Sequence, residues 1–148
     1  MSIHAHRSFT LSKPLNAGGV LFVQNVKHLR DFYRSVFSMN VEADENRYVI
    51  LTIPGFELVI HGIQNETPPA DSQIEPLVVR EESSFKLCLP VIRLEEARVM
   101  AKALGGFIKD QEHEWNFNGI VACDGHDPEG NVIQARQFEL HSQHVLSS

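Results

Sequence analysis

The sequence predicts an α+β fold: two tandem βαβββ modules forming a curved mixed sheet around a cleft, with the helices on the outside. Each half of the chain reads as a strand, an amphipathic helix and three further strands, and a polar, proline-rich stretch separates the halves. The halves align at an offset of 68 residues, from Val23 to Val91, which indicates an internal duplication. We expect one domain over all 148 residues, with modules at about 17–63 and 84–137 and a linker at 64–83.

The first module is predicted from a short apolar strand, a helix and three strands joined by tight turns. The first strand is Gly18–Val23, and Asn25 is the expected N-cap of the following helix. Apolar residues recur in this helix at the spacing of a face packed on a sheet, namely Val26, Leu29, Phe32, Tyr33, Val36 and Phe37. The later strands are expected at 39–43, 48–53 and 56–63.

The second module repeats this order after the linker. We expect a strand at Phe85–Val91 and then a helix that ends at Gly105 or Gly106. A short strand at 107–109, a loop at 111–114 and a strand region at 115–123 follow. Because one such module cannot bury its apolar sheet face alone, two modules side by side are expected to curl around a shared binding cleft.

A tight turn at Asp127–Asn131 precedes the last strand. Pro128 fixes φ in this turn, Gly130 permits a positive φ, and the Asp and Asn side chains can form hydrogen bonds with the local backbone. The strand that begins at Val132 carries an amide, Gln134, where a metal-binding chain would have a carboxylate.

This turn and strand carry a resemblance to a known family. Residues 127–135, Asp-Pro-Glu-Gly-Asn-Val-Ile-Gln-Ala, resemble the last turn and strand of the glyoxalase/bleomycin-resistance/dioxygenase superfamily, also called the vicinal oxygen chelate fold. Residues 23–26, Val-Gln-Asn-Val, with Phe32 and Tyr33 further along, resemble the exit of its first strand and its first helix. Together the matches span roughly 17–137, which is most of the chain.

The resemblance implies where a metal ion would bind. In metal-dependent members of the family, the first and the last strand of each module supply one ligand each, and these positions fall at Gly18, Glu57, Lys86 and Gln134. Only Glu57 is a good ligand, since glycine has no side chain, a charged lysine has no lone pair and an amide is a weak donor. We therefore expect no metal and no other cofactor. If a divalent metal bound, Glu57 and His61 would be its ligands.

We expect the Lys86 ammonium to replace the ion and to lie between the Glu57 carboxylate and the Gln134 carbonyl, since a paired buried charge costs less than a lone one. In the alternative, Glu57 and Lys86 are both half exposed and lie near each other without forming a stabilising ion pair. The expected ligand-binding cleft comprises Glu57, His61, Lys86, Trp115, Gln134 and Arg136.

Three of these cleft residues have a second interpretation. Trp115 is a candidate cavity wall that stacks on a planar ligand, or else a core or dimer-contact residue. Arg136 is a candidate anchor for an anionic ligand, or else a solvated residue at a strand end. His61 is a candidate base or hydrogen-bond donor, or else a structural histidine whose ring is satisfied within the fold.

Composition restricts the partners and the location. The net charge of −6 and pI of about 5.7 argue against nucleic acid or an anionic membrane as a partner. No apolar run approaches the roughly 18 residues of a transmembrane helix, and no signal peptide is evident, so we expect a cytoplasmic protein. Cys88 and Cys123 have no C-x-x-C spacing and are expected to be buried, reduced thiols.

The sequence leaves three functions open. The resemblance favours a metal-free small-molecule-binding protein of the bleomycin-resistance kind that sequesters or senses its ligand. The alternatives are a metal-dependent lyase, isomerase or dioxygenase, and a module whose surface rather than its cleft matters. Metal analysis separates the first two, and a closed or filled cavity would indicate the third. The resemblance also implies a homodimer.

Overall fold

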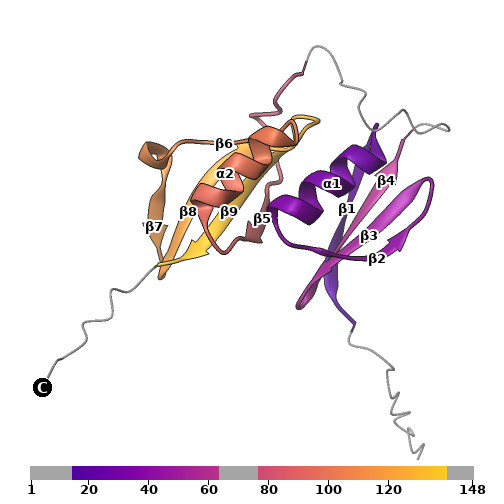
Figure 1. The fold of residues 1–148 in the computed structure, drawn as a ribbon, viewed down its shortest axis with the longest axis horizontal. Helices are drawn as coiled ribbons and strands as arrows, with labels where there is room; N and C mark the ends of the chain where they lie inside the picture. Colours follow the sequence, from indigo (N-terminus) through magenta and orange to yellow (C-terminus); the bar gives the residue numbers. More distant parts are fainter. Residues whose placement is uncertain (1–14, 64–76, 140–148) are drawn as a thin grey trace, which may run out of the picture.

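The computed structural model describes residues 15–63 and 77–139. Within them, the chain forms a four-stranded and a five-stranded mixed sheet, each with one helix (Figure 1). The predicted α+β fold with two βαβββ modules is therefore confirmed. Residues 64–76 of the predicted linker lie outside the described residues. Neither described helix has the length and apolarity needed to cross a membrane.

The first sheet has the strand order β1-β4-β3-β2. Strand β1 is parallel to β4, and the β4–β3 and β3–β2 pairs are antiparallel. The elements of this module are β1 (Ala17–Val23), α1 (Val26–Val36), β2 (Asn40–Asp44), β3 (Tyr48–Ile53) and β4 (Phe56–Gly62). The Asn25 side chain accepts a hydrogen bond from the His28 N–H at 3.1 Å, so the predicted N-cap of α1 is confirmed.

The second sheet repeats this pattern in the order β5-β9-β8-β6, with β7 also paired to β8. Its elements are β5 (Leu87–Pro90), α2 (Leu94–Ala103), β6 (Phe107–Ile108), a 3₁₀ turn (Gln111–His113), β7 (Trp115–Phe117), β8 (Ile120–His126) and β9 (Val132–Phe138). Strand β5 is parallel to β9, as β1 is to β4. Gly105, with φ of 86°, ends α2, and the Gly106 N–H donates to the Ala101 carbonyl, as predicted for a glycine cap.

The prediction of one strand region at 115–123 is wrong. Asn118 and Gly119 both have positive φ, 50° and 74°, and form a turn between β7 and β8. An Asn-Gly pair is the strongest short hairpin signal, because both residues tolerate positive φ. Strands β6 and β7 pair with different parts of β8, so together they take the position that β2 has in the first sheet.

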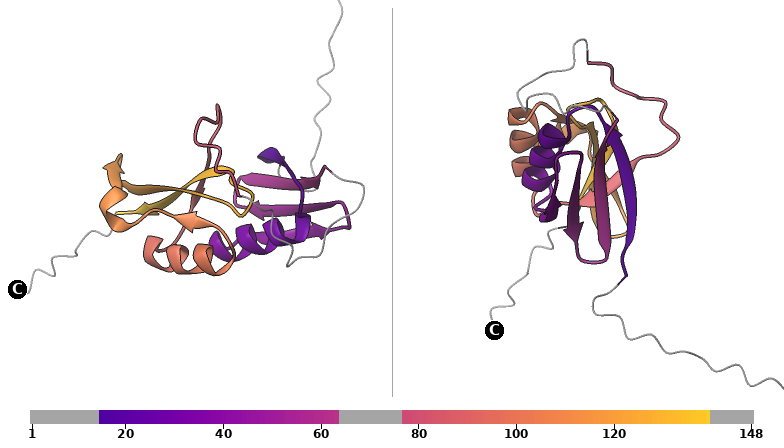
Figure 2. Two further views of the ribbon diagram at one scale, coloured as in Figure 1. Left: turned by 90° about the horizontal axis from the view of Figure 1, so that it is seen from above. Right: turned by 90° about the vertical axis from the view of Figure 1, so that its right-hand side faces the viewer.

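Both helices lie on the same side of the two sheets, as Figure 2 shows, and α1 packs beside α2. The apolar core fills the space between helices and sheets, with Phe32, Tyr33, Leu51, Ile60, Leu89 and Ile133 among its fully buried side chains. Here the opposite side of each sheet is called its open face. The segment 77–86 projects from this side, between the modules (Figure 2).

The turn at Asp127–Asn131 joins the two modules. The Asp127 carboxylate is fully buried and accepts hydrogen bonds from the Tyr33 hydroxyl at 2.8 Å and from the Asn131 amide. The Glu129 carboxylate accepts the backbone N–H groups of Gln24 and Asn25, each at 2.8 Å, where β1 leads into α1. Burial raises the pKa of both carboxyl groups, although these hydrogen bonds oppose the rise.

Both cysteines of the described chain are free. Cys123 is fully buried, and its thiol donates to the Lys109 carbonyl at 3.2 Å. Burial raises the pKa of this thiol, although Arg98 opposes the rise, so the thiol form is favoured. Cys88 is only half buried, on the open face, so the expected burial holds for Cys123 alone.

Candidate functional site

A row of hydrogen-bonded polar side chains crosses the open face of the second sheet. The Lys86 ammonium donates to Asp124 Oδ2 at 2.8 Å, and the Gln134 amide donates to Asp124 Oδ1 at 3.3 Å. Arg136 Nε in turn donates to Gln134 Oε1 at 2.7 Å. We call Lys86, Asp124, Gln134 and Arg136 the polar row.

The strand register explains this arrangement. Side chains alternate between the two faces of a strand, so Gln134 and Arg136, two residues apart on β9, share the open face. Asp124 on β8 is the direct partner of Gln134 across the antiparallel pair. Ala122 lies opposite Arg136 and also opposite Trp115 on β7, so these side chains share the same face.

Aromatic rings border the Arg136 end of the row. The Arg136 guanidinium lies 5.2 Å from the centroid of the Phe117 ring, within the range of a cation–π contact. Trp115 is 39% exposed, so it is neither core nor fully solvated. Trp115 and Arg136 belong to the predicted cleft, whereas Phe117 does not and is placed here by the Asn118–Gly119 turn.

The expected contact of Lys86 with Glu57 is wrong. Lys86 binds Asp124 instead, and no hydrogen bond or ion pair joins it to Glu57, although the structure describes both residues. Glu57 belongs to the other sheet, where its strand partner is Gly18. A usable signal existed in the sequence, because Asp124 and Gln134 are equally distant from Glu129 at the centre of the turn, which predicts that they pair.

Glu57 and His61 lie on the open face of the first sheet but do not form a pair. They are four residues apart on β4, which separates their Cα atoms by about 13 Å at the usual rise per strand residue. His61 Nδ1 lies 2.9 Å from the Gly62 carbonyl, and its ring lies 5.9 Å from that of Phe22. These contacts agree with the structural interpretation of this histidine.

The residues present do not fit a metal centre of the family's kind. A Cβ atom added to Gly18 would lie 2.3 Å from the Glu57 carbonyl oxygen, so no ligand side chain fits at that position without a backbone shift. Lys86 and Gln134 are both bound to Asp124. Among the described residues, no group of three or more His, Cys, Asp or Glu side chains is arranged to hold a metal ion.

A pocket lies at each end of the polar row. The first, of about 240 Å³, is formed in part by Lys86, Asp124, Phe107 and His126. The second, of about 220 Å³, is formed in part by Cys88, Ile120, Arg136 and Phe138. The row therefore offers two partly exposed cations, Lys86 and Arg136, each beside a partly apolar hollow.

Comparisons with known proteins support the fold. No protein-family model and no curated protein matches the sequence. A glyoxalase/bleomycin resistance protein/dioxygenase family enzyme from Burkholderia phytofirmans PsJN is similar in structure, with a TM-score of 0.58, 14% identity and coverage of 83% of this chain and 98% of that one.

Two further solved structures are similar. An integron cassette protein from the mobile metagenome of V. cholerae has a TM-score of 0.56 and 19% identity, with coverage of 88% of this chain and 100% of that one. The fosfomycin resistance protein FosX from Mesorhizobium loti has a TM-score of 0.56 and 9% identity, over 88% of this chain and 96% of that one. The fold implied by the sequence resemblance is confirmed.

Proposed function

We propose that this chain, which has the fold of the glyoxalase/bleomycin resistance proteins, binds a small organic molecule on the open face of its second sheet without a metal ion. The polar row is the observation that carries this proposal. Where the resemblance implies metal ligands in the second module, the chain has Lys86 and Gln134, and both are bound to Asp124. A fixed ammonium and an amide favour an organic guest over a cation.

The chemistry of the row narrows the ligand class. Lys86 and Arg136 are hydrogen-bond donors that suit an anionic or strongly polar group, and the Trp115 and Phe117 rings suit a planar apolar part. A ligand with both features would bridge the two pockets at the ends of the row. Such a protein would act by sequestering or sensing the ligand.

We further propose that a homodimer completes this site. Two isolated open faces leave large apolar side chains in water: Phe22 on the first sheet is 62% exposed and Phe138 on the second is 82% exposed. If two copies pair the first module of one with the second module of the other, both faces are covered. Sedimentation equilibrium tests this, and a monomer at all concentrations would contradict it.

Metal analysis tests the metal-free part of the proposal. Protein expressed with added Zn, Ni, Mn or Fe should contain far less than one metal per chain after purification. A stoichiometric metal would overturn the proposal in favour of a metal-dependent lyase, isomerase or dioxygenase.

A thermal-shift screen of planar, anionic and peptide-like compounds tests ligand binding, because a ligand that binds only the folded state raises the melting temperature. Compounds that bind the row should lose their shift in Lys86→Gln and Arg136→Gln. They should keep it in Arg34→Gln, which removes an exposed arginine from α1. The site would be contradicted if every compound that stabilises the wild type also stabilised both row variants to the same extent.

A further inference from the structure

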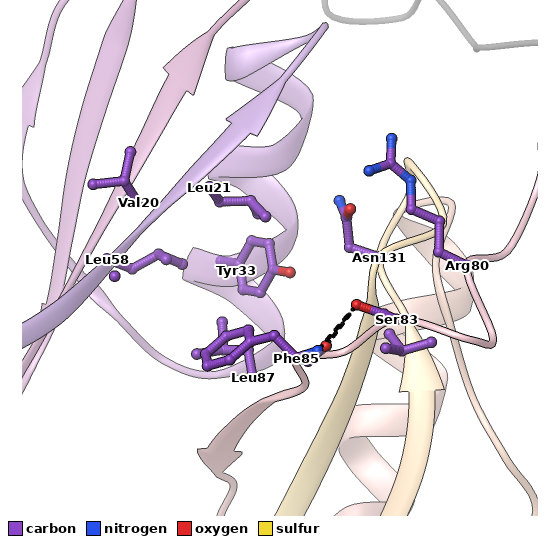
Figure 3. Close-up of a pocket in the computed structure, with 11 residues that line it drawn as sticks. Val20, Leu21, Tyr33, Leu58, Arg80, Ser83, Phe85, Leu87 and Asn131 are labelled. Carbon is purple, nitrogen blue, oxygen red and sulfur yellow. Dashed lines mark hydrogen bonds between the residues drawn. The ribbon is translucent and has the colours of Figure 1, made fainter.

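We propose a second ligand pocket between the two modules, which takes a small aromatic carboxylate. The pocket, shown in Figure 3, has a volume of about 130 Å³. On the side of the first module its walls include Val20, Leu21, Tyr33 and Leu58, and on the side of the second module they include Arg80, Phe85, Leu87 and Asn131. It shares no residue with the polar row.

The volume limits the size of the guest. A dry cavity of about 150 Å³ holds one benzene molecule, so this pocket suits a single ring. The apolar side chains of Val20, Leu21, Leu58 and Leu87 would surround such a ring. Phe85 lines the same pocket and is 70% exposed, which leaves its own ring available for aromatic contact.

Arg80 supplies the charge that selects a carboxylate. Within the described residues, its guanidinium makes no hydrogen bond and no ion pair, and Figure 3 shows it beside Asn131 at the rim. Burial raises the pKa of Glu129 and the Arg80 charge opposes that rise, but the Glu129 oxygens are already occupied by backbone N–H groups. A guanidinium fork matches a carboxylate in geometry as well as in charge.

The other polar groups of the pocket are already engaged. The Tyr33 hydroxyl donates to the Asp127 carboxylate, and the Asn131 amide nitrogen donates to both oxygens of the same carboxylate. Ser83 exchanges hydrogen bonds with the Phe85 backbone. A bound anion would therefore find its principal donor in Arg80, which makes the affinity depend on that one side chain.

The backbone holds Arg80 at the rim. Its N–H donates to the Gly130 carbonyl at 2.8 Å. Gly130 has φ of 82°, and a Cβ atom there would lie only 2.1 Å from the Val78 carbonyl oxygen. Segment 78–80 can approach the turn this closely because residue 130 is a glycine. The turn that joins the modules therefore also positions the Arg80 guanidinium at the rim of the pocket.

Benzoate titration followed by backbone amide NMR tests the pocket. We expect saturable shifts at Val20, Leu21 and Phe85, and benzyl alcohol, the neutral analogue, should bind more weakly. Arg80→Gln should weaken benzoate binding about tenfold or more, as for the loss of one charge-assisted pair, without changing the affinity for benzyl alcohol.

A second variant fills the space instead of removing the charge. Gly19 lines the pocket, and a Cβ atom there would meet nothing within 4 Å, so Gly19→Val should fold and should exclude both probes. Arg34→Gln, which removes an exposed arginine outside both sites, is the charge-matched control and should leave the benzoate-induced shifts at the pocket residues unchanged.

Three results would overturn the inference: no saturable shift at the pocket residues up to tens of millimolar benzoate, equal affinity in Arg80→Gln, or equal affinity in folded Gly19→Val. None of them bears on the polar row, which is tested by Lys86→Gln and Arg136→Gln. The proposal for the pocket between the modules and the proposal for the polar row can therefore each be contradicted without affecting the other.

Discussion

Asp124 and Asp127 lie three residues apart but in opposite surroundings. Asp127 is fully buried between the modules, where the Tyr33 hydroxyl, the Asn131 amide and two backbone N–H groups bind its carboxylate. Asp124 has a 27% exposed side chain on the open face and is bound by Lys86 and Gln134. The same side chain therefore serves as an anchor of the module interface at one position and as part of an accessible surface at the other.

The difference shows which part of the turn motif is structural. In a buried site every polar group needs a hydrogen-bond partner. Losing the Asp127 carboxylate would therefore leave several buried donors without an acceptor. On the open face the Lys86 and Asp124 side chains are 37% and 27% exposed, so water can replace a lost partner of either one. The Asp127 cluster is thus built for stability, and the polar row remains available to a ligand at little structural cost.

The largest expected effect comes from comparing Asp127→Ala with Asp124→Ala. Asp127→Ala leaves the buried Tyr33 hydroxyl and the Asn131 amide without their acceptor, so we expect a loss of at least about 3 kcal/mol in the free energy of unfolding. Asp124→Ala should cost about 1 kcal/mol or less. Urea unfolding at neutral pH measures both. Equal losses would remove the distinction between the two sites.

Two glycines give a second matched pair. Gly55 and Gly130 have nearly the same φ, 81° and 82°, but a Cβ atom at Gly55 meets nothing within 4 Å, whereas at Gly130 it meets the Val78 carbonyl. Gly55→Ala should cost about 1–2 kcal/mol for the left-handed backbone. Gly130→Ala should cost about 1–3 kcal/mol more for the clash. The same unfolding measurement checks this. Similar costs for the two variants would mean that segment 78–80 can move away from residue 130 at little cost in free energy.

The pH dependence of stability tests the burial of Glu129. Burial raises its pKa in the folded state, so the folded protein takes up the proton before the unfolded chain does. The contribution of Glu129 to the free energy of unfolding should therefore rise as pH falls from the raised pKa towards the ordinary value.

Glu129→Gln removes this titration. The difference in unfolding free energy between wild type and variant should shift in favour of wild type as the pH is lowered. A shift in the opposite direction would show that the Gln24 and Asn25 N–H groups outweigh burial and lower the pKa instead.

Local chemistry predicted much of the fold but little of the pairing within the site. The apolar spacing of α1, its Asn25 cap and the glycine end of α2 each depend on residues close in sequence, and each is confirmed. The partner of Lys86 depends instead on which strands are neighbours in a sheet. Glu57 and Asp124 are equally suitable carboxylates by residue type, and strand order alone decides between them.

Two other features also depend on tertiary contacts that the local sequence does not reveal. Tyr33 is in the core, as its helical position predicts, but its hydroxyl bonds to a residue 94 positions away, which no local pattern reveals. Arg80 lies in the stretch that composition predicts to be a linker. Its place beside a pocket follows from the contact of segment 78–80 with Gly130, a tertiary contact.

The smallest expected effect concerns Lys86 itself. Its ion pair with Asp124 has side chains 37% and 27% exposed, so solvent screening and side-chain entropy offset most of the attraction. Lys86→Met keeps the length of the side chain and should change the free energy of unfolding by about 0.5 kcal/mol or less. A loss comparable to that of Asp127→Ala would assign Lys86 to the structural framework. The change in the free energy of unfolding could instead be near zero while the same variant loses its ligand-induced thermal shifts. That result would show that Lys86 on the open face serves ligand binding, whereas Asp127 at the module interface serves stability.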